Sequence, residues 1–133
     1  MAILAAVAAP RYAAAVARYR ADFAARRIAA DLNAASVNAR TTSHALSVVF
    51  DRANNKYQIA GTKELDSAAT NYLVSLGADP YLVSIGTVNF NGASTVTFSA
   101  YGDPDNAGSV TVQAGSVTKT VTLDGVTGNA SVQ

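Results

Sequence analysis

The spacing of apolar residues along the chain changes near residue 40. Before that point the sequence is rich in alanine and contains no glycine, a composition that favours helix. Four large apolar residues recur there at intervals of three or four positions, which places them on one helical face. They are Tyr12, Val16, Tyr19 and Phe23. The pattern predicts one continuous helix over residues 11–39.

A second apolar side begins further along the same helix. Ile28 and Leu32 lie one turn apart and project roughly opposite to the first stripe. Ala30, Ala34 and Val37 continue near the first face. Because a helix that is apolar on two sides needs two partners, we expect the Ile28 side to pack on the chain's own domain. We expect the first stripe, up to Phe23, to lie on a projecting arm and to contact another subunit.

Pro10 interrupts the apolar start of the chain. Proline removes a backbone hydrogen bond, so it should kink or locally melt a helix, unless the helix begins there. Residues 2–9 are apolar, but a spanning helix needs roughly 20 such residues. The segment also lacks the basic start of a secretory signal. We expect it to be the end of a longer apolar anchor, with Met1 as an imposed start.

After residue 40 the pattern becomes that of antiparallel strands with one wet face. Asn54-Asn55 and Asn91-Gly92 are hairpin turn signals, because Asn and Gly tolerate positive φ. Residues 61–79 are polar and mixed, and predict a long loop with one short strand at 72–76. The other expected strands are 45–50, 56–60, 81–90, 95–101, 109–114, 117–124 and 130–132. The fold class is therefore α+β: a long N-terminal helix over residues 1–40, packed on an antiparallel β-sheet or β-sandwich domain of six or seven strands over residues 41–133.

Charge is unevenly distributed between the two parts. Residues 1–40 carry six Arg and two Asp, whereas residues 41–133 carry four Lys or Arg and seven Asp or Glu. A basic helix could bind nucleic acid or an anionic membrane, or its arginines could simply solvate the helix and pair with acidic neighbours. The aromatic residues of the helix share their stripe with Val16, which is packing geometry, so we do not expect nucleic acid as a partner.

Residues capable of chemistry are few. The chain has no Cys, and His44 is its one histidine, so thiolate metal sites and Cys nucleophiles are excluded and His44 is expected to be a capping or surface residue. Glu64 stands with Asp66 in a predicted loop, a poor start for a two-carboxylate hydrolase. Asp103 and Asp105 are candidate calcium ligands, although such clusters more often form turns capped by their own side chains. No catalytic residue, resident metal or cofactor is predicted, and the chain is not expected to be an enzyme.

The opening residues 2–12, Ala-Ile-Leu-Ala-Ala-Val-Ala-Ala-Pro-Arg-Tyr, resemble the second half of the hydrophobic segment of type IV pilins and pseudopilins. The rest of the chain looks like the soluble domain of minor pseudopilin H of the type II secretion system and of its pilus counterparts. The residues that carry this likeness are Ser47-Val48-Val49-Phe50-Asp51, Asn54-Asn55-Lys56-Tyr57, Asn89-Phe90-Asn91-Gly92, Phe98, Gly102, Val121-Thr122-Leu123 and Thr127-Gly128. The family's leader, its methylated Phe and its Glu lie outside this sequence.

The resemblance implies a structural subunit of a secretion pseudopilus or pilus-like filament, assembling with other pilin or pseudopilin subunits through the N-terminal helix. The implied interface residues are Ile3, Leu4, Val7, Pro10, Tyr12, Val16, Tyr19 and Phe23. It also implies a single-pass inner-membrane protein with a periplasmic domain, or an extracellular filament. Two alternatives remain open: a pilin-like module that captures DNA or a surface ligand, and an unrelated β-rich phage or surface-layer protein with a helical arm.

Overall fold

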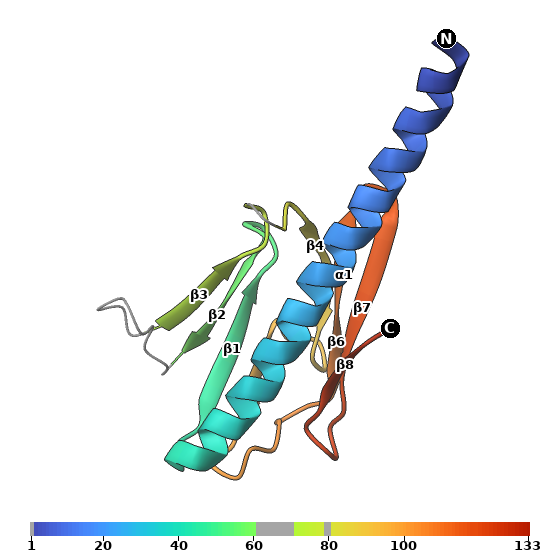
Figure 1. Ribbon diagram of the computed structural model, residues 1–133. Coiled ribbons are helices and arrows are strands. Elements are labelled where there is room, and N and C mark those ends of the chain that lie inside the picture. Colours follow the sequence, from blue (N-terminus) through green and yellow to red (C-terminus); the bar gives the residue numbers. More distant parts are fainter. Residues whose placement is uncertain (1, 61–70, 79–80) are drawn as a thin grey trace.

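The computed structural model describes residues 2–60, 71–78 and 81–133, with the backbone alone at 2–11, 71 and 72. One helix precedes eight strands (Figure 1). Their bounds are α1 Ala2–Thr42, β1 Leu46–Asp51, β2 Lys56–Ala60, β3 Asn71–Ser75, β4 Ser84–Asn89, β5 Thr95–Phe98, β6 Gly108–Ala114, β7 Val117–Leu123 and β8 Ala130–Val132. The α+β class and the long helix are confirmed, and each of the eight segments expected to form a strand overlaps one, so the total of six or seven was too low.

Helix α1 runs unbroken for 41 residues, straight through Pro10. Figure 1 shows its first turns continuing in line beyond the strands. The local melting expected at Pro10 is therefore wrong, and so is a helix start there, because the flanking alanines favour helix strongly enough to outweigh one lost hydrogen bond. The helix ends in a left-handed residue, Ser43 (φ 56°), after which the amide of His44 donates to the carbonyl of Ala39 at 3.2 Å.

The strands form two antiparallel four-stranded sheets. The first has the order β3-β2-β1-β5 and the second β4-β6-β7-β8. Helix α1 contacts β1 and β5 of the first sheet and β6, β7 and β8 of the second. The helix thus lies across both sheets, and the three pack around one core.

Two of the predicted turns have the expected conformation. Asn55 closes the β1–β2 hairpin with φ 52°, and Asn91-Gly92 reverses the chain with φ 57° and 87°. Asn55 also connects three elements, because its carbonyl accepts from the amide of Leu76 at 2.8 Å and its side chain accepts from the amide of Ile85 at 3.0 Å.

The strand expected over 81–90 is wrong at its start. Tyr81 and Leu82 form a turn in which both amides donate to the carbonyl of Ala78 at 3.1 Å, and Leu82 takes a left-handed φ of 51°. The strand begins at Ser84, and Gly86 lies at a register shift against β6. The strand expected over 95–101 likewise ends at Phe98, because the chain turns where the amide of Gly102 donates to the carbonyl of Ser99.

The buried side of the helix is made mostly of alanine. Ile28 and Leu32 are fully buried in the core, as expected, and six alanines are buried around them. These are Ala21, Ala24, Ala25, Ala29, Ala35 and Ala39. Small side chains let the helix approach the sheets closely, while the larger residues of the strands fill the remaining space.

Candidate assembly surface

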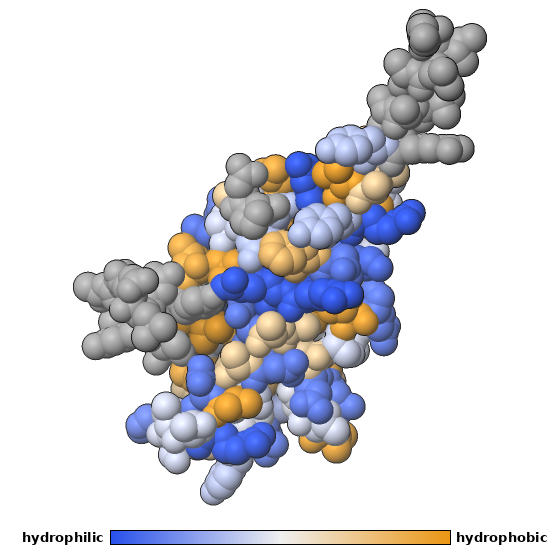
Figure 2. All heavy atoms as spheres, in the orientation of Figure 1, coloured by the Kyte–Doolittle hydropathy of each residue, from blue (hydrophilic) through white to orange (hydrophobic). Residues whose placement is uncertain are grey.

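The exposed side of α1 carries the stripe expected from the sequence. Tyr12 and Tyr19 are 75% and 69% exposed, and Val37 is 55% exposed further along. Figure 2 shows apolar and weakly polar side chains following the helix, interrupted by a hydrophilic band. Ile3, Leu4, Val7 and Pro10 belong to α1 by their backbone, and their side chains lie outside the described residues. Over its described side chains, α1 is thus buried on one side and carries exposed apolar residues on the other.

Phe23 does not project freely. Its ring stacks on Tyr19 at a centroid distance of 5.9 Å and on Tyr81 at 5.2 Å, and Tyr81 is buried in the domain. Phe23 keeps 40% of its surface exposed. The expectation that the helix leaves its own domain before Phe23 is therefore wrong, because Tyr81, in the turn before β4, stacks on the Phe23 ring. The stripe is joined to the β domain by a row of three aromatic rings.

The helix in fact stays in contact with the domain further toward its N-terminus. Ala17 packs against the core, and its methyl group lies against the β6–β7 turn, 3.6 Å from where a Cβ would stand on Gly115. A hollow of about 390 Å³ opens there between Tyr12 and Val16 of the helix and Leu82 of the turn before β4. Among the described side chains, helix residues as far forward as Tyr12 thus lie beside the domain, about three turns before Phe23.

A polar cluster that sequence reasoning missed fixes the middle of the helix to the sheets. Arg27 donates from Nε to Asp31 Oδ2 at 3.0 Å, and the same carboxylate oxygen accepts the hydroxyl of buried Tyr57. Arg27 also reaches the hydroxyl of Tyr81 at 3.4 Å. The i,i+4 spacing of Arg27 and Asp31 was visible in the sequence, but the tyrosines come from distant segments.

Burial and the neighbouring charges set the ionisation of this cluster. Burial, together with the adjacent Asp31 carboxylate, raises the pKa of Tyr57 far above its ordinary value, so the hydroxyl stays protonated and donates. Burial alone would lower the pKa of Arg27, but its hydrogen bond and attraction to Asp31 raise that pKa overall. The cluster is therefore a charged pair clamped by a neutral tyrosine, which is a positioning device rather than a proton-transfer site.

Three further contacts hold the C-terminal half of α1. The amide side chain of Asn33 pairs with the backbone of Ala130, donating at 3.2 Å and accepting at 2.9 Å. The buried hydroxyl of Ser36 donates to the carbonyl of Gly102 at 2.7 Å, and Arg40 donates to the carbonyl of Tyr101 at 3.2 Å. These bonds join the helix to β8 and to the β5–β6 loop, so the helix has one register on the domain.

The residues considered as catalytic or metal-binding candidates do not form a site among the described residues. His44 is exposed at the end of the helix, and Glu64 and Asp66 lie outside the described residues. Asp105 is exposed, and its carboxylate accepts from the amide of Thr97 at 3.1 Å, while the backbone of Asp103 pairs with Ser99. Within residues 12–60, 73–78 and 81–133, no three His, Asp or Glu side chains are grouped as a metal site would need.

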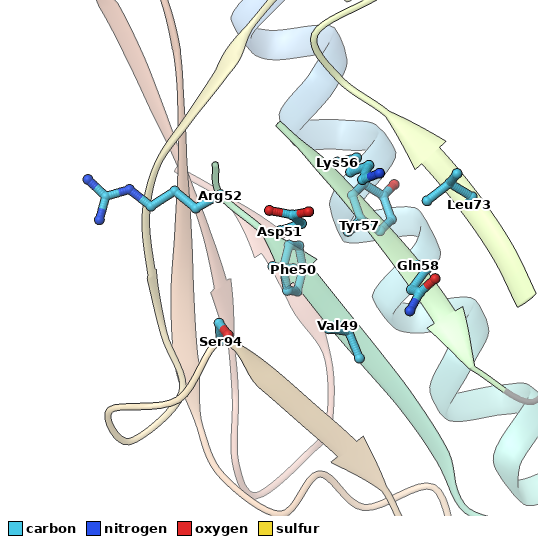
Figure 3. A pocket seen from close by; sticks show the side chains of 9 residues that line it. All are labelled: Val49, Phe50, Asp51, Arg52, Lys56, Tyr57, Gln58, Leu73 and Ser94. Carbon is cyan, nitrogen blue, oxygen red and sulfur yellow. The ribbon is translucent and has the colours of Figure 1, made fainter. Parts of the chain in front are cut away.

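A further hollow, of about 600 Å³, lies over the outer face of the first sheet (Figure 3). Val49, Gln58 and Leu73 line it from three adjacent strands, with Lys56 at one end. Asp51, also at that end, is held by its own turn: the side chain of Asn54 donates to it at 2.7 Å, and this bond lowers the pKa of Asp51. The mixture of one carboxylate with a lysine, an amide and aliphatic groups does not constitute a catalytic arrangement.

Comparison with known proteins relates most of the sequence to one family. Residues 24–128 match the model of the family described as type II transport protein GspH. No curated protein and no solved structure matches the chain significantly. Among the residues that the structure describes, no helix is both long enough and apolar enough to cross a membrane.

Proposed function

Because the chain belongs to the GspH family of type II transport proteins, we propose that it is a pseudopilus subunit that assembles through the exposed stripe of α1. The family is one of structural pseudopilins rather than enzymes, and its members act in protein secretion with other pseudopilin subunits. Membership of this family supports a location at the inner membrane and in a periplasmic filament. Beyond this family role, we propose that the exposed stripe of α1 is the surface that contacts the neighbouring subunit.

The observation that carries the proposal is the exposure of Tyr12 and Tyr19 on a helix that is already docked by its other side. Exposed aromatic side chains in a row usually mark a partner surface, because their burial releases ordered water and loses little rotamer freedom. The arginines beside them, Arg18 and Arg20, keep the free chain soluble without covering the rings. Ile3, Leu4, Val7 and Pro10, which precede the stripe along the sequence, are the other interface residues that we propose.

The alternative role, capture of DNA by a basic helix, has weaker support. Two of the helix arginines are already paired, Arg26 with Asp22 at 2.9 Å and Arg27 with Asp31 at 3.0 Å. DNA binding depends on the number of cations free to replace counterions on the phosphates. Because these arginines are already paired with carboxylates, fewer cations of the helix are available to bind phosphates, and a protein partner is favoured over DNA.

The test is the variant Tyr19→Glu, compared with Leu73→Glu, which changes an exposed apolar residue on β3. Each chain is produced together with the other pseudopilins of its system, and its incorporation into sheared filaments is measured. Tyr19→Glu is expected to lose incorporation while its thermal unfolding stays that of the wild type, since Tyr19 is 69% exposed. Leu73→Glu is expected to assemble normally. Normal assembly of Tyr19→Glu would remove the stripe from the interface.

A further inference from the structure

Each of the two sheets ends in two edge strands, which are β3 and β5 in the first sheet and β4 and β8 in the second. The outer side of an edge strand carries backbone amides and carbonyls with no strand to pair with, so it can accept a strand from another chain. Proteins usually block such edges with side chains, bulges or covering loops. The four edges of this protein are not blocked to the same degree.

The edges of β5 and β8 are blocked by hydrogen bonds from other parts of the chain. In β5, the carbonyl of Thr97 accepts from the amide of Asp105 at 2.9 Å, and the amide of Thr97 donates to the Asp105 carboxylate at 3.1 Å. In β8, the amide and the carbonyl of Ala130 are both paired with the side chain of Asn33. These backbone groups are therefore not available to another strand.

The edge strand β4 is interrupted in two ways. The amide of Ile85 donates to the side chain of Asn55 at 3.0 Å. The register of β4 against β6 also shifts at Gly86. Such an irregularity breaks the even row of bonding groups that an incoming strand needs, so it protects an edge.

Strand β3 keeps a free outer edge, at the outer side of the first sheet (Figure 1). The amide of Leu76, just after β3, donates to the carbonyl of Asn55 at 2.8 Å, and bonding alternates along an antiparallel pair. Val74 therefore bonds toward β2, whereas the amides and carbonyls of Leu73 and Ser75 point away from the sheet. No described residue forms a hydrogen bond with these outward groups. The strand also contains no proline, lysine or arginine that would deter pairing.

The outer face of the sheet beside this edge is hollowed. The hollow of about 600 Å³ is lined by Val49, Gln58 and Leu73 on three successive strands (Figure 3). Leu73, on the edge strand itself, is 48% exposed. Lys56 lies on the same face as Gln58 and opposite Ser75 in the register of β2 with β3. A strand added to β3 would therefore place its side chains beside an apolar surface that has a cation at one end.

That end of the hollow is positive on balance, because Lys56 and Arg52 line it with one carboxylate, Asp51. Asp51 lies opposite Lys56 in the β1–β2 hairpin, and it accepts from the side chain and the backbone amide of Asn54 at 2.7 and 3.2 Å. Within the part of the chain that the structure describes, neither Lys56 nor Arg52 forms a salt bridge. The excess of positive charge favours an incoming carboxylate.

We propose that the free edge of β3 binds an extended segment of another polypeptide, which pairs antiparallel with β3 and adds a strand to the first sheet. An apolar side chain of the segment lies opposite Leu73, and a carboxylate lies opposite Ser75. Neighbouring strands are about 4.8 Å apart, so this carboxylate residue and Lys56 lie two strands, or roughly 10 Å, apart at their backbones, a gap that their long side chains can span over the small serine. Main-chain hydrogen bonds supply the affinity, and the side chains supply the preference.

An acidic partner fits this edge better than a second copy of the chain. Strand β3 carries no acidic residue, so pairing two β3 strands would leave Lys56 without a carboxylate from the partner strand. The edge is also separate from the stripe on α1, because α1 packs on β1 and β5 of this sheet and β3 lies beyond β2. The inference therefore goes beyond the proposed function and does not depend on filament assembly.

The probe is the fluorescein-labelled peptide Ser-Thr-Glu-Val-Leu-Val-Thr-Ser, whose Glu falls opposite Ser75 when its Leu lies opposite Leu73. Ser75→Pro removes an outward amide and leaves the bonds from Val74 to β2 intact, as proline does on an edge strand. Ser75→Ala is the matched control, because it changes the same side chain and keeps the amide. Fluorescence anisotropy at increasing protein concentration is expected to show binding by the wild type and by Ser75→Ala, and at least several-fold weaker binding by Ser75→Pro. Equal binding by the two variants, or no binding by the wild type, would overturn the proposal.

Charge reversal supplies a second measurement that does not depend on the folding of a proline variant. Lys56→Glu is expected to weaken binding of the peptide, and a peptide with Lys in place of its Glu should bind Lys56→Glu better than it binds the wild type. Added salt should reduce both differences. If the exchanged pair binds no better than the mismatched pairs, the assigned charge contact is wrong and the proposal falls.

Sedimentation of the protein without peptide tests the other occupant. A dimer that forms at high concentration and is lost in Ser75→Pro would assign the edge to a second copy and overturn the proposal. Failure of this proposal is also distinct from failure of the proposed function, because Tyr19→Glu is expected to bind the peptide as the wild type does. Normal filament incorporation of Tyr19→Glu would refute the assembly stripe and leave the edge of β3 as the binding site.

Discussion

Replacing Leu32 by alanine should test the docking of the helix more directly than any other single change. Leu32 is 1% exposed and lies on the buried side of α1 with Ile28. Leucine-to-alanine changes at fully buried sites cost about 2–5 kcal/mol, and the cost rises with the volume of the cavity that remains. The neighbours three residues away on the same side are Ala29 and Ala35, which are too short to fill that space.

We therefore expect a loss of about 3 kcal/mol or more in the free energy of unfolding of Leu32→Ala. That is a large share of the roughly 5–15 kcal/mol that stabilises a typical domain. Urea unfolding followed by far-ultraviolet circular dichroism measures it, and the slope against urea should stay that of the wild type because the exposed surface changes little.

Val37→Ala is the matched control on the same helix. Val37 is 55% exposed, on the opposite side, so its change should stay within about 0.5 kcal/mol. The docking described above would be refuted if the two variants unfolded at the same urea concentration as each other. It would be equally refuted if Leu32→Ala lost less than about 1 kcal/mol.

Two further predictions concern the polar cluster at the middle of the helix and the start of the docked segment. Tyr57→Phe removes the hydroxyl that donates to Asp31 and should lower the free energy of unfolding by about 1–2 kcal/mol, the lower end for a bond to a charged group, because Arg27 still donates to the carboxylate. The control Tyr101→Phe changes an exposed ring and should leave the free energy of unfolding unchanged. Equal melting temperatures for the two variants would contradict a stabilising role of the Tyr57 hydroxyl. Limited trypsin digestion should cut after Arg11 before it cuts after Arg18 or Arg20, because the helix lies beside the domain near Val16. Mass spectrometry follows the three cleavages over time. Cleavage after all three arginines at the same rate would show that the helix is not docked there.

The features that were predictable from the sequence are those set by neighbouring residues. Helix periodicity placed Ile28 and Leu32 in the core, and the Asn91-Gly92 pair specified its turn, because both signals act within a few residues. The start of β4 was mispredicted because residues 81–83 are as apolar as a strand, whereas Leu82 takes a left-handed conformation imposed by hydrogen bonds to Ala78. Periodicity carries no information on such a bond.

The candidate surface was predictable only in part for a related reason. The exposed stripe followed from the two-sided helix, but its attachment to the domain did not. Phe23 meets Tyr81, and Asp31 meets Tyr57, across separations that no local pattern records. The hollow between Val16 and Leu82 likewise exists because Leu82 and Gly115, from different parts of the chain, come to lie beside Val16.

The composition of the buried helix side explains why polar contacts are needed at all. A face built mostly of alanine allows close approach, but it is smooth, and small side chains offer few projections that would resist sliding along the sheets. Hydrogen bonds have fixed lengths and directions, so Asn33 on Ala130 and Ser36 on Gly102 permit only one register. The register in turn fixes where Tyr12 and Tyr19 lie relative to the domain and to Leu82. A filament contact that uses both the helix and the domain can therefore form only if these interior polar bonds hold the helix in place.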